Sequence, residues 1–483
     1  MAKTLRIWLA SLTFLGFMLL FFDPSEEAVL AKSLSWLASL QLVPAILAGS
    51  FLLVALLLII TALFGRIYCS VLCPLGVLQD IFGACVIWRK YTYSEGHPIL
   101  RLVFLILFLA AFLLGIPVLF GILEPYSAFG RITTYFGEPI TRMAANGVEW
   151  IAQSCGVLLL YPQTVIVGSE STLIVAGSTL AILLFFALTR GRIWCTAICP
   201  VGTVLGFLSR HALIRPRIKA DACVHCGRCA SVCKANCIDA KYGTIDASRC
   251  LSCWNCSSVC QKDALHFLPA KEKVQGSTVD RDGRRVTLVA LASLLAYPVE
   301  KVFAAEEHDV AAIQYKERRL HDMPLLPPGA LGQTHFSSRC TGCQLCVSAC
   351  PHSVLRAYDR GKGALQPSMT FEYGYCHTNC VLCGTVCPTG AIRPVSVSQK
   401  AKIQVGRAFV LRHTCVVAVD RVSCTACQRV CPTGAIRLVS TEEPKIPFVD
   451  TEKCIGCGAC EYICPARPFA AIQVKSVEEH RTL

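Results

Sequence analysis

The sequence predicts two structural classes in one chain: an α-helical membrane domain, followed by small cysteine-rich domains of the α+β class. Hydrophobic residues make up 54% of the 483 residues and charged residues only 16%, and the mean hydropathy is +0.53. This composition excludes a soluble enzyme as a description of the whole chain. The 31 cysteines fall mostly into evenly spaced runs, which favours metal ligation over the disulfide framework of a small secreted protein.

Four apolar stretches predict transmembrane helices within residues 1–215, and they cover 7–22, 44–65, 99–121 and 172–189. A spanning helix needs about 20 apolar residues, and the first stretch is slightly short. Lysine and arginine gather after the second and fourth stretches, so the positive-inside rule places the N-terminus and these two loops in the cytoplasm. This asymmetry and basic loops around the cysteine runs explain most of the net charge of +14. Nucleic-acid binding is not expected, because no basic stripe with interleaved aromatic residues occurs.

A twelve-residue pattern occurs twice in this half, as GRIYCSVLCPLG at 65–76 and GRIWCTAICPVG at 191–202. We interpret it as a duplicated helix pair that ends in Cys-x3-Cys-Pro. Residues four apart share one face of a helix, so each copy can present two sulfurs to one point. The cysteines concerned are Cys69, Cys73, Cys195 and Cys199. They can bind a metal or cluster, act as dithiols near a quinone, or simply pack as small soft side chains.

Two regular cysteine runs in residues 216–270 have the spacing C-x2-C-x2-C-x3-C. This spacing is typical of bacterial two-cluster ferredoxins, in which three cysteines of one run and the fourth of the other bind one [4Fe–4S] cluster. A structural zinc site instead shows two separated pairs. The predicted ligands are Cys223, Cys226, Cys229, Cys233, Cys250, Cys253, Cys256 and Cys260. Lys234 and Gln261 stand where a proline usually follows the fourth cysteine.

Four further runs predict a four-cluster domain at residues 320–483, although the two middle runs have longer first gaps. We expect a nested pairing, in which the outer runs exchange their fourth cysteines and the inner runs do the same. The predicted ligands are Cys340, Cys343, Cys346, Cys350, Cys376, Cys380, Cys383, Cys387, Cys415, Cys424, Cys427, Cys431, Cys454, Cys457, Cys460 and Cys464.

The six predicted clusters use 24 cysteines and the repeated motif uses four, which leaves Cys85, Cys155 and Cys237. We expect these three to be buried apolar thiols or spares. No Cys-x-x-Cys-His and no Gly-x-Gly-x-x-Gly occurs, so covalent haem, flavin and nicotinamide have no support in the sequence.

Residues 281–305 join the two cysteine-rich parts and resemble an export signal of a loose twin-arginine type, because two arginines precede about fourteen apolar residues. Fourteen helical residues span about 21 Å, less than a bilayer core of about 30 Å. We interpret the segment as a retained signal that forms a fifth, short membrane anchor and leaves residues 320–483 in the periplasm. The alternative is a buried apolar linker with both cysteine-rich parts in the cytoplasm.

The spans, the two repeated motifs and the first ferredoxin domain resemble the NapH/MauN family of membrane ferredoxin-type proteins over residues 1–270. The remainder, from about residue 280 to residue 483, resembles the partner family, NapG/MauM, so the chain resembles a fusion of the two. This resemblance implies an oxidoreductase, a quinol dehydrogenase of the bacterial cytoplasmic (inner) membrane. It would pass electrons from quinol through [4Fe–4S] clusters to a periplasmic acceptor, a cytochrome or a reductase such as a nitrate-reductase-like enzyme. The alternative classes are an assembly or reactivation factor that reduces a metal centre or cysteines of another respiratory enzyme, and a passive scaffold.

Glu124, in the segment LEPYSAFGR with Arg131 nearby, is the best-placed ionisable residue for quinol chemistry. Ionisable groups at membrane depth are functional candidates, although a carboxylate in an interfacial loop is the plainer interpretation. The four cysteines of the repeated motif are the other candidates, as quinone-proximal or redox-active groups.

Overall fold

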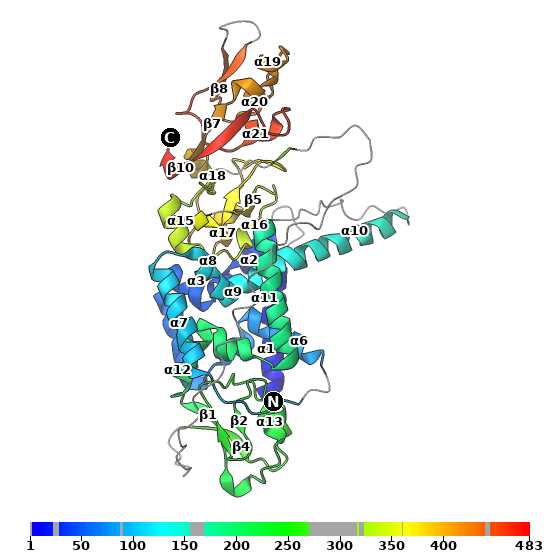
Figure 1. The fold of residues 1–483 in the computed structure, drawn as a ribbon, viewed down its shortest axis with the longest axis vertical. Coiled ribbons are helices and arrows are strands. Elements are labelled where there is room, and N and C mark those ends of the chain that lie inside the picture. The colour runs from blue at the N-terminus through cyan, green and yellow to red at the C-terminus, as the bar shows by residue number, and fades with distance from the viewer. Residues whose placement is uncertain are drawn as a thin grey trace, which may run out of the picture.

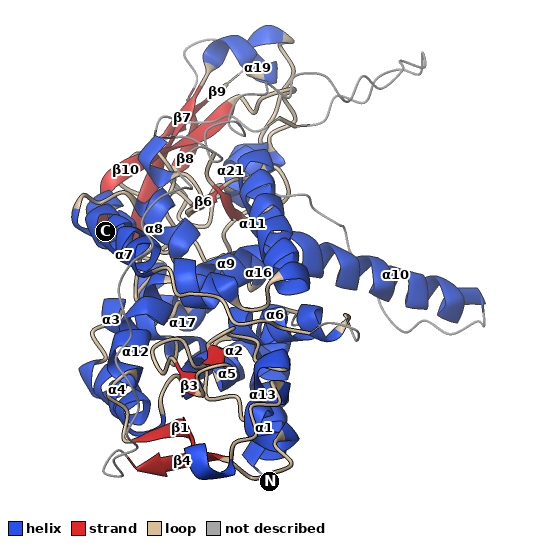
Figure 2. Cartoon of the chain, turned by 60° about the horizontal axis from the view of Figure 1, so that its bottom comes forward, coloured by secondary structure: helices blue, strands red, loops and turns tan. Residues whose placement is uncertain are grey.

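The computed structural model describes residues 2–22, 29–86, 90–154, 169–269, 316–317, 323–359, 361–439 and 445–483. The predicted export segment at 281–305 and Cys155 lie outside these residues. The molecule is elongated, with a helical body (residues 2–213) between two cysteine-rich parts (Figure 1). We call these the lower ferredoxin part (214–269) and the upper ferredoxin part (323–483). Within the described residues, all strands belong to the cysteine-rich parts (Figure 2).

Two of the four predicted spans are single helices long and apolar enough to cross a membrane. They are α1 (Ala2–Phe21) and α11 (Glu170–Thr189). The other two predicted spans are divided, because Gly49 and Gly115 adopt left-handed φ values of 74° and 63°. Left-handed backbone ends an α-helix and suits glycine. The resulting helices are α3 (Leu42–Leu47), α4 (Phe51–Phe64), α7 (Pro98–Leu113) and α8 (Pro117–Leu123).

The two copies of the repeated motif begin and end with the same local backbone structure. A glycine with positive φ, Gly65 or Gly191, ends the preceding helix, and a short helix carries the first cysteine. The second cysteine, Cys73 or Cys199, is extended and is the N-cap of the next helix, whose first residue is proline. The expectation that both cysteines share one helix face is therefore wrong. The short helices are α5 (Ile67–Val71) and the π-helix η2 (Trp194–Ile198), and the following ones are α6 (Pro74–Ala84) and α12 (Pro200–Ser209).

The remaining helices of the body lie near its upper end. They are α2 (Val29–Ser39), α9 (Pro125–Ile132), the π-helix η1 (Thr133–Gly137) and α10 (Glu138–Ser154). Helix α10 projects sideways from the body (Figure 1).

The lower ferredoxin part is a small α+β unit. Strand β1 (Ile214–Ile218) pairs antiparallel with β4 (Leu265–Pro269), so the first and last strands of the unit lie together. A second hairpin and the short helices lie between them in sequence: β2 (Ile238–Asp239), β3 (Thr244–Ile245), η3 (Ala220–Ala222), α13 (Arg228–Ser231) and α14 (Asn255–Val259).

The upper ferredoxin part contains two such units, one stacked on the other (Figure 1). The unit next to the body consists of α15 (Gln333–Arg339), α16 (Leu345–Ser348), β5 (Leu355–Ala357), η4 (Gly361–Gly363), β6 (Pro367–Met369) and α17 (Leu382–Val386). The outer unit, entered through α18 (Val397–Lys400), consists of β7 (Ile403–Val410), η5 (Arg412–Thr414), α19 (Val416–Val419), α20 (Ala426–Val430), β8 (Ile436–Val439), β9 (Ile446–Val449), α21 (Ala459–Ile463) and β10 (Ile472–Thr482). Strand β7 pairs with β10 and β8 with β9, both antiparallel.

The chain between the lower and upper parts connects opposite ends of the helical body. Strand β4 ends the lower part at Pro269, whereas the backbone N–H of Glu317 donates a hydrogen bond of 2.8 Å to the carbonyl of Pro468 in the upper part. Pro269 of the lower part and Glu317, which contacts the upper part, therefore lie toward opposite ends of the body (Figure 1).

Candidate functional site

Four predicted ligands of the lower ferredoxin part line one cavity of about 140 Å³. They are Cys223, Cys226 and Cys229 of the first run and Cys260, the fourth cysteine of the second run. This is the exchange that the spacing predicts. Four thiols around one cavity fit a [4Fe–4S] cluster, which needs four thiolate ligands.

The other cysteines of the lower part form a second group. Cys250, Cys253 and Cys256 all lie within electrostatic range of Cys233, so the first run supplies their fourth partner. Within the described residues, no three His, Cys, Asp or Glu side chains converge closely enough to hold a single metal ion.

Cys237, which the sequence analysis left as a buried thiol or a spare, is a neighbour of this second group. Its sulfur lies 3.5 Å from that of Cys233, and it is buried. A hydrogen bond from Cys237 lowers the pKa of the Cys233 thiol and that of the Cys250 thiol, which favours the thiolates that iron binds. Cys237 stands four residues after its run, where Ala391 and Ala435 stand in the upper runs, so alignment of the runs would have revealed it.

In the upper ferredoxin part the runs pair in sequence order, so the predicted nested pairing is wrong. Cys387 lies within electrostatic range of Cys340, Cys343 and Cys346, and Cys350 lies within that range of Cys376 and Cys383. In the outer unit Cys464 is close to Cys427, and Cys431 is close to Cys454, Cys457 and Cys460. Each unit has its own antiparallel strand pairs: β5 with β6 in the inner unit, and β7 with β10 and β8 with β9 in the outer unit. Consecutive cysteine runs therefore share a unit, whereas the first and the last run belong to different units.

The ligand groups of the upper part form a line that starts at the helical body. A Cβ atom at Gly130 in α9 would clash with the carbonyl oxygen of Cys343, so the first cysteine loop lies directly on this helix. Farther out, the backbone N–H of Cys376 donates a hydrogen bond of 3.0 Å to the carbonyl of Cys457. The inner and outer units therefore contact each other through their ligand loops.

The four cysteines of the repeated motif come together in the core of the body. Each is only 5% exposed, and Cys73 lies within electrostatic range of the other three. The two copies hold each other through their arginines. Arg66 Nη2 donates to the carbonyl of Cys195 at 2.6 Å, and Arg192 Nη1 donates to the carbonyl of Cys69 at 2.5 Å.

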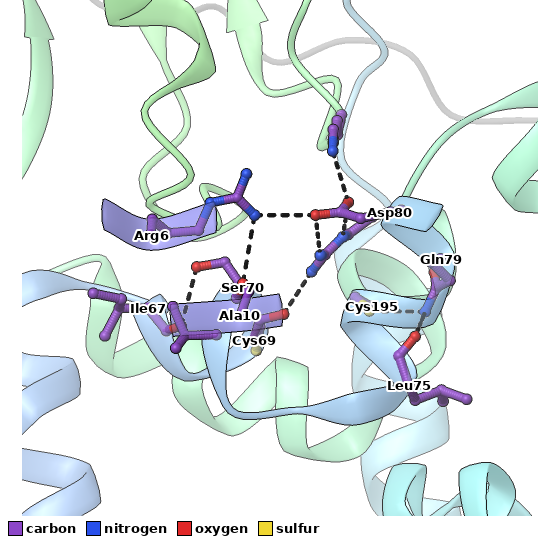
Figure 3. Close-up of polar contacts among 12 residues, drawn as sticks. Arg6, Ala10, Ile67, Cys69, Ser70, Leu75, Gln79, Asp80 and Cys195 are labelled. Atoms are coloured by element: carbon purple, nitrogen blue, oxygen red, sulfur yellow. Dashed lines mark hydrogen bonds and ion pairs between the residues drawn. The ribbon is translucent and has the colours of Figure 1, made fainter. Parts of the chain in front are cut away.

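Asp80 connects this core to the lower ferredoxin part. Its carboxylate lies 2.6 Å from Arg192, 3.2 Å from Arg6 and 3.0 Å from Lys234. Figure 3 shows Arg6 facing Asp80, and Gln79 facing Cys195 beside them. Lys234 follows Cys233 directly, in the place usually taken by proline. A proline could not make this ion pair, which explains the departure from the usual run.

Glu124 is 1% exposed and is the N-cap of α9, where it accepts a hydrogen bond from the backbone N–H of Ser127. It is therefore a buried carboxylate rather than one in an open interfacial loop. Arg131 is also buried and donates to the carbonyl of Gly121 at 2.8 Å. Glu124 lies within electrostatic range of Cys343 above it.

Tyr68, which the sequence did not single out, lies between Glu124 and the buried cysteines. Its hydroxyl donates to Gln41 Oε1 at 2.8 Å and lies within electrostatic range of Cys73, Cys69 and Glu124. The aromatic position of the repeated motif was the available signal, since Tyr68 and Trp194 occupy it in the two copies.

Paired cysteine runs in small α+β units, arranged on a helical body, define a ferredoxin-type protein with several [4Fe–4S] sites. Family models agree: a 4Fe-4S dicluster domain matches residues 339–391 and 421–467, and 4Fe-4S binding domains match 46–91, 172–220 and 220–240. The two segments of the dicluster match each contain a sequential pair of ligand loops.

The chain is similar to methylamine utilization ferredoxin-type protein MauM of Methylorubrum extorquens, with 36% identity over 29% of this chain and 67% of the relative. It is 29% identical to ferredoxin-type protein NapG of Escherichia coli over 32% of this chain and 71% of the relative. It is 25% identical to methylamine utilization ferredoxin-type protein MauN of Paracoccus denitrificans over 41% of this chain and 55% of the relative. The chain belongs to the MauM family of ferredoxin-type proteins. Its similarity to NapG and MauN supports a fusion of the two types. These matches cover between 55% and 71% of each relative's length.

Proposed function

We propose that the protein is a membrane-bound quinol dehydrogenase that passes electrons through its [4Fe–4S] clusters to a periplasmic acceptor, such as the reductase of a nitrate-reductase-like system. The observation that carries this proposal is the position of Glu124. It is buried in the helical body and lies within electrostatic range of Cys343, a predicted ligand of the first upper cluster.

The surface of the body supports a membrane location. Its helices α4 and α7 expose large apolar side chains along their length, including Leu52, which is 87% exposed, and Leu113, which is 80% exposed. A contiguous apolar surface of this kind is rare on soluble proteins and normal against lipid tails. We propose that the helical body spans the bacterial cytoplasmic membrane, with the divided segments completing four spans.

The positions of the two ferredoxin parts support a periplasmic upper part. They lie at opposite ends of the helical body (Figure 1). With the arginine-rich loops and the lower part in the cytoplasm, the upper part lies outside. The apolar stretch within 281–305 is then the fifth, short membrane anchor.

The residues around Glu124 are suited to handle the protons of quinol oxidation, which yields quinone, two protons and two electrons. The Glu124 carboxylate can accept one proton from a quinol hydroxyl, and the second proton leaves through polar residues at the membrane face. Arg131 stabilises the Glu124 carboxylate in its buried position. Tyr68 and Gln41 form a hydrogen-bonded pair on the side of the buried cysteines. Clusters bound by the upper cysteines supply one-electron acceptors, so the two electrons leave separately.

The test uses anaerobically purified full-length protein in detergent, with a menaquinol analogue as the donor. We expect the analogue to reduce the clusters, and the Glu124→Gln variant to slow this reduction at least tenfold while keeping its iron. Glu170→Gln at an exposed position of α11 is the matched control and should behave like the unmodified protein. No reduction of the unmodified protein by quinol, with dithionite still effective, would refute the proposal. An unaffected Glu124→Gln variant would refute the role of Glu124.

A further inference from the structure

The two copies of the repeated motif bring four buried thiols together, and we propose that Cys69, Cys73, Cys195 and Cys199 bind one iron–sulfur cluster that the two copies share. This deepens the proposed function, on which its role in electron transfer rests, because the site lies between the lower and upper ferredoxin parts. Binding replaces four S–H bonds by four Fe–S bonds, and the four protons leave to solvent.

The first argument is the number of thiols that each copy supplies. A ferredoxin-type cluster needs four thiolate ligands. The family match at 172–220 contains only Cys195 and Cys199. The match at 46–91 contains Cys69, Cys73 and Cys85, and Cys85 is exposed at the far end of α6. Neither copy can hold a cluster alone, whereas the fold brings both pairs within electrostatic range of each other.

The second argument is charge. Buried cations are stable only when an anion compensates them. Arg66 and Arg192 are buried beside the four thiols, and Arg6 and Lys234 also surround this core. Asp80 forms ion pairs with three of these four cations. Arg66 has no carboxylate within ion-pair distance in the described residues; its donors go to Ser248, the Cys195 carbonyl and Cys69 Sγ. Thiolates around a cluster supply the missing negative charge, and neutral thiols do not.

The third argument is hydrogen bonding to sulfur, which is typical around iron–sulfur clusters. Gln79 Nε2 lies 3.3 Å from Cys195 Sγ, and the backbone N–H of Gly202 lies 3.3 Å from Cys199 Sγ. Arg66 Nη2 lies 3.9 Å from Cys69 Sγ. These groups donate to sulfurs of cysteines that are only 5% exposed. In the described residues the four sulfurs, like the predicted ferredoxin ligands, do not converge on a site for a single metal ion.

The fourth argument is position. On the lower side, Arg66 lies within electrostatic range of Cys250 and Arg192 within that range of Cys253. On the upper side, Tyr68 links the site to Glu124, which lies beneath Cys343. A bilayer core is about 30 Å thick, so electron transfer between the lower and upper ferredoxin parts covers a long distance. A cluster at this site would divide that distance into two shorter electron-transfer steps.

The test is metal content and Mössbauer spectroscopy of the anaerobically purified, ⁵⁷Fe-labelled full chain, without any quinol. The six ferredoxin sites account for about 24 iron atoms per chain, and we expect about two or about four more. The double variant Cys195→Ser/Cys199→Ser should lose this additional iron and one spectral component. Cys69→Ser/Cys73→Ser should lose the same component, and the fourfold variant should lose no more than either double variant. Cys85→Ser is the matched control and should keep all of the iron.

Several results would overturn the inference: unchanged iron in both double variants, additive losses that indicate two separate sites, or one zinc per chain that disappears with the cysteines. Survival of the ferredoxin components shows that a variant has folded. Where a double variant fails to fold, Arg66→Gln keeps all four thiols. It should keep the iron but lower the reduction potential of the additional component, and an unchanged potential would count against the site. Because quinol is not used, these outcomes are independent of those that test the proposed function.

Discussion

Lys234 Nζ lies 3.0 Å from Asp80 Oδ1, so the residue that follows a cluster ligand in the lower ferredoxin part is paired with a carboxylate of the helical body. The same carboxylate binds Arg6 of the first helix and Arg192 of the second motif copy. One buried side chain thus joins three parts of the chain that are far apart in sequence. The lower part is also attached by the backbone N–H of Arg192, which donates to the carbonyl of Lys234 at 2.9 Å.

Replacing Asp80 by Asn should destabilise the protein strongly, because three cations would then surround a neutral amide. Loss of one partner of a buried ion pair costs about 3–5 kcal/mol. We expect a lower thermal unfolding midpoint in detergent and faster proteolysis between the body and the lower part. Asp221→Asn, at an exposed position of the lower part, is the control. Equal stability of the two variants would contradict the role of Asp80.

Replacing Cys237 by Ala should lower the reduction potential of the cluster bound by Cys233, Cys250, Cys253 and Cys256. A hydrogen bond to sulfur stabilises the more negative, reduced form. A neutral hydrogen bond contributes about 0.5–1.5 kcal/mol, which corresponds to roughly 20–60 mV for a one-electron couple. EPR-monitored redox titration measures the shift, and iron content should stay constant. A loss of iron would instead identify Cys237 as a ligand, and Cys85→Ala serves as the control.

Replacing Gly130 by Ala should disturb the contact between the helical body and the upper ferredoxin part, since the added Cβ meets the carbonyl oxygen of Cys343. Overpacking of this kind costs about 1–3 kcal/mol. We expect slower reduction of the upper clusters by quinol at unchanged iron content. Gly147→Ala in α10 is the matched control, because a Cβ atom at this position would have no neighbour within 4 Å. Equal reduction rates in the two variants would show that the contact is unimportant.

A reporter enzyme that is active only outside the cytoplasmic membrane should be active when fused after Leu483. The same reporter should be inactive when fused after Pro269, at the end of the lower part. Activity in both fusions or in neither would contradict the proposed topology and favour an apolar linker at residues 281–305.

The candidate ligands could be predicted from the sequence because local spacing sets the three cysteines that bind three corners of one cluster. The pairing of the upper runs could not, since it depends on which strands pair, and the short strands give little signal of their order. The sequence also predicted apolar spans without their interruptions, because a single glycine such as Gly49 or Gly115 changes the backbone without changing the hydropathy.

The contacts that organise the core were the least predictable. Arg66 donates to the carbonyl of Cys195, 129 residues away, and Arg192 donates to the carbonyl of Cys69, 123 residues away. The repeated motif indicated that both copies matter, but not that each arginine serves the other copy. The role of Asp80 could not be predicted from the sequence. It depends on ion pairs with three cations from distant parts of the chain, which only the structure brings together.

The placement of the ferredoxin parts at opposite ends of the body has an electrical consequence. Under the proposed topology, an electron that travels from the lower part to the upper part moves one negative charge outward through the bilayer. Its driving force then changes by about 2.3 kcal/mol for every 100 mV of membrane potential. An electron delivered by quinol at Glu124, near the upper end, crosses little of that field. The two entry points of one molecule would therefore respond differently to membrane voltage, and a membrane that is positive outside would favour outward transfer from the cytoplasmic end.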